Sequence, residues 1–196
     1  MIKLPNPKKK GDLSLEEVIN NRRTRRELIE EGITLEDLSQ LLWAAQGITD
    51  PGKVKKTAPS AGARYPYEIL ISVTNVEGLD SGLYRYLPQK NTLEALNLKI
   101  NDKLKKAAFD QGFLDNSAVD IILTADYKKT TEKYKNRGVR YVHIEAGHIA
   151  QNICLQAEAL GLGSVLVGAF DDDKIKEILG LEKRDVTYIL SIGRYK

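Results

Sequence analysis

Residues 139–168 read VRYVHIEAGHIAQNICLQAEALGLGSVLVG, and this stretch decides the fold. No proline interrupts residues 139–160, and their apolar side chains recur at a helical period. Gly161 follows as a residue that readily adopts the left-handed conformation of a helix cap. At about 1.5 Å per residue the predicted helix is more than about 30 Å long, the diameter of a small domain. Residues 164–168 predict a strand, so the stretch joins one long helix to a strand.

Outward from this stretch, further helices and strands are predicted along the chain. Ser14 and Thr34 open two capping boxes: the first helix runs from about residue 15 into a group of arginines, and the second ends at Gly47. Other predicted helices span residues 102–110, 127–136 and 171–179, and other strands span 68–74, 83–87, 92–98, 120–124 and 187–192. Because the regular alternation of a doubly wound fold is missing, an α+β fold is predicted.

The composition is that of a folded and nearly neutral protein. Of the 196 residues, 42% are apolar, and 30 Lys and Arg against 27 Asp and Glu leave a formal charge of +3. This balance excludes a disordered or fibrous chain, and the charge is too small to indicate nucleic acid by itself. We predict a basic N-terminal segment over residues 1–13 and a single domain over residues 14–196.

Cysteine content and hydropathy indicate the compartment. Cys154 is the single cysteine, so no intrachain disulfide forms, which suits a reducing cytosol. The basic start of the chain lacks the apolar core of a signal peptide, and no stretch free of charge reaches the roughly 18–20 residues of a membrane helix. A cytoplasmic protein without a membrane segment is therefore expected.

Four arginines and a threonine in residues 22–26 (RRTRR) form the most unusual local feature. A solvated basic face at a helix C-terminus is the plain interpretation, because cations complement the helix dipole there. The sharper interpretation is an anion site, because the planar guanidinium of arginine binds phosphate through two hydrogen bonds and Thr24 adds a neutral donor. No interleaved aromatic platform supports nucleic acid.

Two stretches of small residues are further candidates. The loop over residues 49–66 is too long for a simple connector, and its segment APSAGARYP (58–66) lets a flat ligand approach the backbone, although an ordinary surface turn is equally plausible. The glycines of residues 161–168 do not follow the spacing of a Rossmann site and lead from helix to strand, the reverse of the needed order. A dinucleotide site of that type is excluded.

Metal and nucleophile chemistry find little support. His143, Glu145 and His148 lie on the long helix, but a di-iron site needs a second Glu-x-x-His, and the chain has only two histidines. We interpret the three as polar groups with which the long helix packs against its neighbours, and we predict no metal site. The motifs of serine hydrolases and P-loop enzymes are also missing.

Several stretches together resemble the nitroreductase family of FMN-dependent oxidoreductases, and in particular its SagB-type dehydrogenase branch. Residues 22–26 resemble the family's Arg-Arg-Ser-x-Arg signature, and residues 38–47 (LSQLLWAAQG) its second helix. Residues 58–66 are similar to the SagB-type flavin loop, and residues 82–86 (GLYRY) and 140–152 (RYVHIEAGHIAQN) to further blocks of that branch. The resemblance runs from about Ser14 to the end of the chain.

The resemblance implies a three-layer α+β fold, with helices on both faces of a mixed or antiparallel sheet, that dimerises around the long helix. It also implies FMN at the subunit interface, in contact with Arg22, Arg23, Thr24, Arg26, Pro59, Ser60, Ala61, Gly62, Val167, Gly168 and Arg194. The first three hold the phosphate and Arg26 lies toward the pyrimidine side of the ring. Residues 59–62 line the flavin, in this family often from the opposite subunit. Residues 167 and 168 lie under the ring, where the Gly168 N–H reaches N5, and Arg194 closes on the phosphate.

Some positions depart from the family pattern. Many nitroreductases carry Asn where this chain has Ala63, which removes or replaces one contact with the ring. Thr24 replaces the serine conservatively. The chain ends at Lys196 without the long C-terminal extension of several members, which leaves open whether Arg194 and Lys196 complete the phosphate site.

For the activity, the resemblance implies a ping-pong reaction in which NAD(P)H reduces the flavin and an electron-poor acceptor, such as a nitroaromatic or a quinone, then takes the electrons. The alternative within the SagB-type branch is dehydrogenation of thiazolines or oxazolines in a modified peptide, for which Lys133-Tyr134 resembles a Lys-Tyr pair implicated as base. An exposed pair on a charged helix is the plain interpretation of these two residues. A non-enzymatic protein that binds flavin or nucleic acid is the alternative from another class. The catalytic residues stay unassigned.

Overall fold

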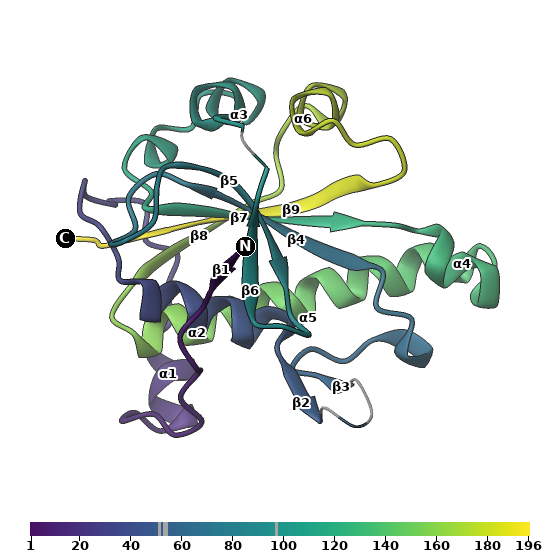
Figure 1. Cartoon of the computed structure of the whole chain (residues 1–196), viewed down its shortest axis with the longest axis horizontal. Coiled ribbons are helices and arrows are strands. Elements are labelled where there is room, and N and C mark those ends of the chain that lie inside the picture. Colours follow the sequence, from purple (N-terminus) through teal and green to yellow (C-terminus); the bar gives the residue numbers. More distant parts are fainter. Residues whose placement is uncertain (51, 53–54, 97) are drawn as a thin grey trace.

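The computed structural model describes residues 1–50, 52, 55–96 and 98–196. Within them a seven-stranded sheet has the order β1-β6-β5-β4-β7-β9-β8, and each neighbouring pair is antiparallel. Helices cover both of its faces, so the chain folds in three layers (Figure 1). The predicted α+β, three-layer fold is confirmed, with an antiparallel rather than a mixed sheet.

The elements follow the predicted order closely. The sheet contains β1 (Ile2–Lys3), β4 (Tyr67–Val73), β5 (Gly82–Leu87), β6 (Thr92–Ala95), β7 (Val119–Ala125), β8 (Gly163–Val167) and β9 (Asp185–Gly193). The helices are α1 (Leu15–Asn21), α2 (Leu35–Gln46), α3 (Asn101–Ala107), α4 (Lys128–Tyr134), α5 (Arg137–Ala159) and α6 (Asp172–Leu179). A separate hairpin of β2 (Ile48–Asp50) and β3 (Lys55–Lys56) and two short 3₁₀ helices, Ala61–Ala63 and Gly112–Asp115, complete the described part.

The sheet is buried on both faces because alternate side chains of its central strands enter two different cores. In β4, Ile69 and Ile71 pack in the core beneath α2 and α5, and Leu70 between them packs in the core beneath α3 and α6. Figure 1 shows α2 and α5 on one side of the sheet and α3 and α6 on the other. This double burial explains why the central strands read as nearly continuous apolar runs.

One predicted helix boundary is wrong. The first helix does not run into the arginines: α1 ends at Asn21, and Arg22 has the extended backbone angles φ −52° and ψ 123°. The chain then pairs with β8, where Thr24 forms a parallel bridge with Ser164 and the Arg25 N–H donates to the Ser164 carbonyl at 3.2 Å. Pairing with the sheet replaces the last helical turn because it satisfies the same backbone groups.

Other differences concern short or masked segments. The predicted strand 92–98 ends at Ala95, and its residue 97 lies outside the described residues. Residues 51, 53 and 54 of the predicted 49–66 loop also lie outside them. The rest of that loop contains β2, β3 and a 3₁₀ turn, which the sequence did not predict. These elements have only two or three residues, too few for a periodic pattern.

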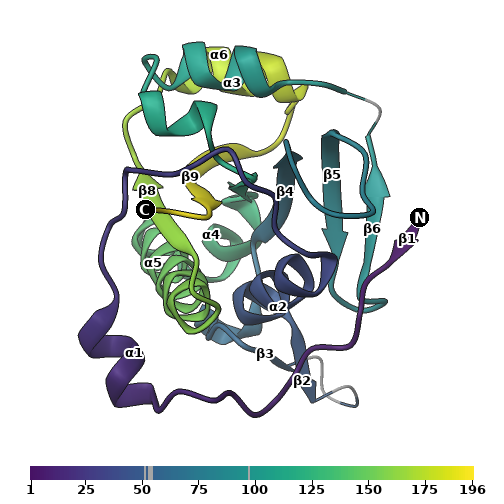
Figure 2. The ribbon, with the colours of Figure 1, turned by 90° about the vertical axis from the view of Figure 1, so that its left-hand side faces the viewer.

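The N-terminal segment packs against the sheet and α2. β1 pairs with β6, and Leu4 is buried in the core beside it. The Ser39 hydroxyl donates to the Pro5 carbonyl at 2.6 Å, and the Gln40 amide both donates to and accepts from the backbone of Lys8. Figure 2 shows this segment leading from the edge of the sheet past α2 to α1. The predicted division at residue 13 stays a prediction.

Within the described residues, no helix combines the length and the apolar composition that crossing a membrane requires.

Candidate functional site

The arginine cluster, residues 22–26, lies along the outer edge of the sheet. Its bridge to Ser164 occupies the edge of β8 that faces away from β9. Because backbone groups of alternate residues in a strand point to the same edge, those of Leu166 point to this edge as well. Among the described residues, no segment pairs with it beyond Ser164. The edge therefore leaves backbone donors and acceptors available next to a group of cations.

Two further predicted site residues, Val167 and Gly168, lie at the end of β8. Val167 ends β8 and is buried, and Gly168 comes directly after it and is exposed. A Cβ at Gly168 would come no closer than 3.8 Å to Tyr188, so the backbone there is open to a flat group. The structure thus brings residues 22–26, 167 and 168 to one edge strand.

The arginines of the cluster differ in the hydrogen bonds and ion pairs that their side chains form. Arg25 forms a half-buried ion pair with Glu158 of α5 at 3.3 Å and lies over the Tyr195 ring at 4.3 Å, so its role is structural. Arg23 donates to the carbonyl of Asn20 at 2.7 Å. Within the described residues, the guanidinium groups of Arg22 and Arg26 have no hydrogen bond or ion pair. Arg22 and Arg26 are therefore the cations of the cluster that are available to an anionic ligand.

Arg194 lies close to the same segment. Its carbonyl accepts from the Ile29 N–H at 2.9 Å, and the neighbouring Tyr195 pairs with Leu28. Its guanidinium faces Asp37 at the start of α2, with Nη2 and Oδ2 at 3.6 Å. Arg194 is thus near the arginine cluster but is already partly neutralised, and the Lys196 N–H donates to the Glu27 carbonyl.

The predicted flavin loop, residues 59–62, lies away from the arginine cluster. The backbone at its end and just after it is strained. Gly62, Ala63 and Tyr65 have φ angles of 58°, 52° and 44°, a region that only glycine adopts freely. A Cβ on Gly62 would lie 2.5 Å from Tyr134 Oη and 2.9 Å from Lys133 Nζ. The φ of Gly62 favours glycine there, a larger residue would make both side chains move, and both side chains of the Lys133-Tyr134 pair point at the loop.

One chain does not bring the loop and the arginine cluster together. The Ser60 hydroxyl faces Glu145 in the first half of α5, whereas Arg25 binds Glu158 near its end. Thirteen residues of helix separate these two anchors, about 20 Å at 1.5 Å per residue. Figure 1 shows α4, next to the loop, and α1, next to the cluster, at opposite ends of α5.

A buried acid, Glu145, and a half-buried base, Lys56, lie near the loop, and neither was predicted as a site residue. Glu145 is 2% exposed, and burial raises its pKa to about 7, against the opposing effects of Ser60 and Lys56. Burial lowers the pKa of Lys56 to about 8, which the charge of Glu145 partly offsets. The available signal was the spacing: Glu145 follows Val142 by three residues and so shares the core face of α5.

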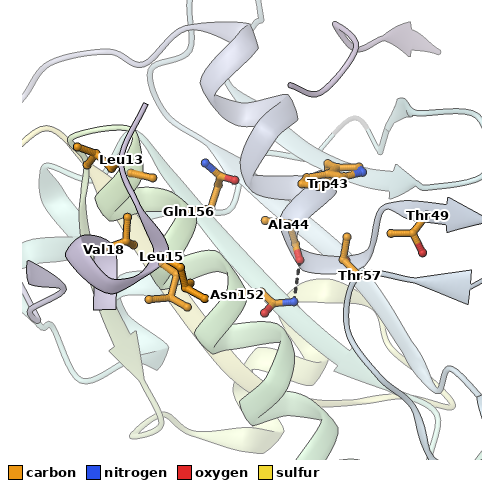
Figure 3. Close-up of a pocket in the computed structure, with 11 residues that line it drawn as sticks. Leu13, Leu15, Val18, Trp43, Ala44, Thr49, Thr57, Asn152 and Gln156 are labelled. Atoms are coloured by element: carbon orange, nitrogen blue, oxygen red, sulfur yellow. Dashed lines mark hydrogen bonds between the residues drawn. The ribbon is translucent and has the colours of Figure 1, made fainter. Parts of the chain in front are cut away.

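A groove of about 480 Å³ runs between α1, α2 and α5 (Figure 3). Leu13, Leu15 and Val18 line it on one side and Trp43 and Thr57 on the other. On its floor the Asn152 amide donates to the Ala44 carbonyl at 3.1 Å. None of the predicted site residues lines this groove.

Comparison with known proteins decides the family. The model of the nitroreductase family matches residues 19–194, a range that includes the arginine cluster, the loop and β8. The chain belongs to the nitroreductase family. The predicted family is therefore confirmed.

Individual nitroreductase relatives agree with this assignment. A Methanocaldococcus jannaschii protein that is provisionally named a nitroreductase is 42% identical over 184 residues, which cover 93% of this chain and 92% of that protein. The microcin B17-processing protein McbC of Escherichia coli, a relative of the SagB-type branch, is 27% identical and matches 81% of this chain and 60% of its own length. A crystal structure of a provisionally named nitroreductase from Ralstonia eutropha superimposes with a TM-score of 0.86 at 26% identity, covering 100% of this chain and 89% of that chain.

Proposed function

We propose that the protein is an FMN-dependent oxidoreductase. The observation that carries the proposal is the alignment of the unpaired Arg22 and Arg26 with the open edge of β8. A phosphate dianion needs fixed cations and backbone or hydroxyl donors, and both are present there. Arg22, Arg23 and Thr24 would hold the phosphate, with Arg194 beside them, and Arg26 and Gly168 would lie along the ring.

The second part of the proposal is a homodimer. Residues 59–62 lie at the other end of α5 from the arginine cluster, so a site that needs both is incomplete in one chain. A two-fold dimer across α5 would set the loop of one protomer beside the cluster of its partner. The apolar side chains on this side of the molecule fit such an interface, because Leu13, Leu15, Ile19, Val139 and Ile144 are all exposed.

In the leading form of the proposal, NAD(P)H is the electron donor and a nitroaromatic or quinone-type compound the acceptor. When bound, FMN would supply the redox chemistry, namely hydride and electron transfer between donor and acceptor. The protein orients the ring through residues 59–62 and 168. Arg26 stabilises negative charge at the pyrimidine side, which favours reduction. A protein nucleophile is not needed.

A specific observation favours a second candidate, the dehydrogenation of azolines in a modified peptide. Tyr134 Oη and Lys133 Nζ both point at Gly62, in the loop that would line the flavin. Lys133 Nζ also lies 5.2 Å from the centre of the Tyr134 ring, so the two side chains form one group beside the loop. The pair is therefore suited to accept a proton from a substrate next to the ring.

The test of the proposed function begins with purified protein. We expect an FMN absorption spectrum, oxidation of NAD(P)H when an acceptor is added, and loss of FMN in the Arg22→Gln variant. Arg137→Gln, which removes an exposed arginine at the start of α5, is the matched control and should keep FMN. A colourless protein that cannot be reconstituted, and that binds DNA with a steep dependence on salt, would overturn the proposal in favour of nucleic-acid binding.

The two candidate activities separate with one pair of variants. Lys133→Met and Tyr134→Phe should leave NAD(P)H-driven reduction of a quinone nearly unchanged but abolish oxidation of a thiazoline-containing peptide. A peptide oxidation that is equally fast in both variants would contradict the role of the pair.

A further inference from the structure

A second pocket, of about 290 Å³, opens beside the loop, at Arg64 and Tyr65. The end of α2, β3, the start of β4 and the residue before β9 contribute to its wall through Gln46, Lys56, Glu68 and Arg184, and Lys129 reaches it from α4. None of the predicted flavin-binding residues in the arginine cluster or in β8 lines this pocket. Flavin binding by those residues therefore does not explain the pocket.

The charges on the wall of this pocket are strongly unbalanced. Four cations line it, Lys56, Arg64, Lys129 and Arg184, against one carboxylate, Glu68. That carboxylate is shared, because Arg85 and Arg184 both face its Oε1 atom, at 3.4 and 3.6 Å. Excess positive charge in a concave, partly desolvated site attracts an anion more strongly than the same charge on an open surface.

Two of the cations are already occupied by neighbours, and two are not. Arg64 donates to the Lys129 carbonyl at 2.6 Å and faces Glu132 at 3.4 Å, while Arg184 is held by Glu68. Within the described residues, the ammonium groups of Lys56 and Lys129 have no carboxylate at ion-pair distance. The positive charge that remains for a ligand lies mainly on these two lysines, and the nearby Glu145 offsets part of that of Lys56.

Of the two lysines, Lys56 gives the stronger indication of a ligand, because it is partly buried. Its ammonium donates to Gln46 Oε1 at 2.6 Å and lies 4.9 Å from the centre of the Tyr65 ring, yet an ammonium has three donors to satisfy. Gln46 itself is 1% exposed, and its Nε2 atom, which has no hydrogen-bond partner in the described part of the chain, lies beside the Glu145 carboxyl. Unsatisfied donors in a partly buried site are costly, and an acceptor from a ligand would satisfy the remaining donors of the Lys56 ammonium. The lowered pKa of Lys56 has the same origin in burial.

We propose that this pocket binds the anionic group of a small ligand, a phosphate or a carboxylate, with Lys56 as its principal contact and Lys129 as a further donor. The volume suits one anionic group with a short organic portion rather than an entire dinucleotide. If the proposed function holds, on which this step rests, the loop of residues 59–65 connects the pocket to the flavin. The pocket then selects substrates that carry a negative charge at one end and a reducible or oxidisable group at the other.

Calorimetric titration of the FMN-loaded protein with inorganic pyrophosphate, and separately with benzoate, tests the proposal. Loading with FMN keeps the arginine cluster occupied, so that binding reports the second pocket. We expect saturable binding of at least one of the two anions and a loss of at least tenfold in affinity in Lys56→Gln. Binding of pyrophosphate alone identifies a phosphate ligand, and binding of benzoate alone a carboxylate.

Matched variants separate charge from structure. Lys56→Arg should keep most of the affinity, and Lys183→Gln, which removes an exposed lysine next to Arg184 that does not line the pocket, should keep all of it. Arg22→Gln should lower FMN affinity and leave anion affinity unchanged, so failure of the flavin proposal is distinguishable from failure of this one. Absence of binding to the unmodified protein, or equal affinity in Lys56→Gln, overturns the proposal.

Discussion

At the scale of single residues, the loop of residues 59–65 stores backbone strain beside the site. Ala63 has a φ of 52°, a conformation that costs an L-residue about 1–2 kcal/mol relative to glycine. Many nitroreductases carry Asn at this position, as noted above, and Asn tolerates the left-handed region better than Ala. The departure from the family pattern therefore has a conformational cost.

This cost gives a direct prediction for Ala63→Gly. Glycine adopts the left-handed conformation without strain, so the free energy of unfolding should rise by about 1 kcal/mol, as measured by urea denaturation. Ala61→Gly is the control, because residue 61 has no positive φ and gains nothing from glycine. A loss of stability in Ala63→Gly equal to that of the control would contradict the account of the loop.

Asp120 predicts how stability depends on pH. It is buried in β7, and burial raises its pKa to about 7, against opposing hydrogen bonds from Ser191 and Ser117. The folded protein holds this proton more tightly than the unfolded chain, whose carboxyl has a pKa near 3.8. The stabilisation by the bound proton is therefore complete below about pH 4 and declines as the pH rises toward 7. Glu145, with its raised pKa, contributes in the same direction.

Asp120→Asn should accordingly flatten this decline. Between pH 4 and pH 7 the free energy of unfolding of the unmodified protein should fall, and the variant should lose on the order of 1–3 kcal/mol less over the same range. Denaturant titrations at several pH values measure both slopes. Equal slopes in the two proteins would show that Asp120 does not titrate in this window.

Individual residues also show where reading the sequence stops. Residues 22–26 could be predicted as a candidate anion site because four guanidinium groups in five positions are unusual by themselves. Lys56 and Glu145 could not be predicted as site residues, because Lys56 is one of three lysines in residues 53–56 (KVKK) and Glu145 reads as one more polar residue of the long helix. Only the fold, which brings Lys56 of β3 near the buried Glu145 of α5, makes their environment unusual.

At the scale of elements, helix starts were predictable and helix ends were less so. Ser14, Thr34 and Asp171 each accept from the backbone N–H three residues on, as their side chains predict. The end of α1 depends instead on its pairing with Ser164, some 140 residues away in sequence. No local signal in residues 15–26 encodes that pairing.

The position of this segment depends on Arg25, which predicts a second effect. Arg25→Met leaves Glu158 half-buried without its partner, so stability should fall by about 1–2 kcal/mol and FMN affinity should fall as residues 22–24 lose their anchor. Chemical denaturation and FMN titration measure the two effects. Lys174→Met, which removes a largely exposed ion pair with Asp171, should change stability by less than about 0.5 kcal/mol. The account fails if both variants behave alike.

At the scale of the whole molecule, we propose that the flavin site is divided between two protomers. The sequence motifs were enough to name candidate site residues, but they do not tell how far apart those residues lie in the folded chain. The fold separates these residues into two groups at opposite ends of α5, along a side of the molecule with exposed Leu15 and Ile144. Two-fold pairing is the arrangement that reunites the groups without changing either one.

Complementation between two defective variants tests this claim most directly. One variant, Arg22→Gln with Arg23→Gln, damages the cluster, and the other, Gly62→Trp, damages the loop, so neither alone should bind FMN. Mixed dimers of the two contain one site in which both the cluster and the loop are intact, so FMN absorption should return after subunit exchange. If cluster and loop acted within the same chain, every site in the mixed dimer would remain defective, and absence of bound FMN in verified mixed dimers would contradict the account.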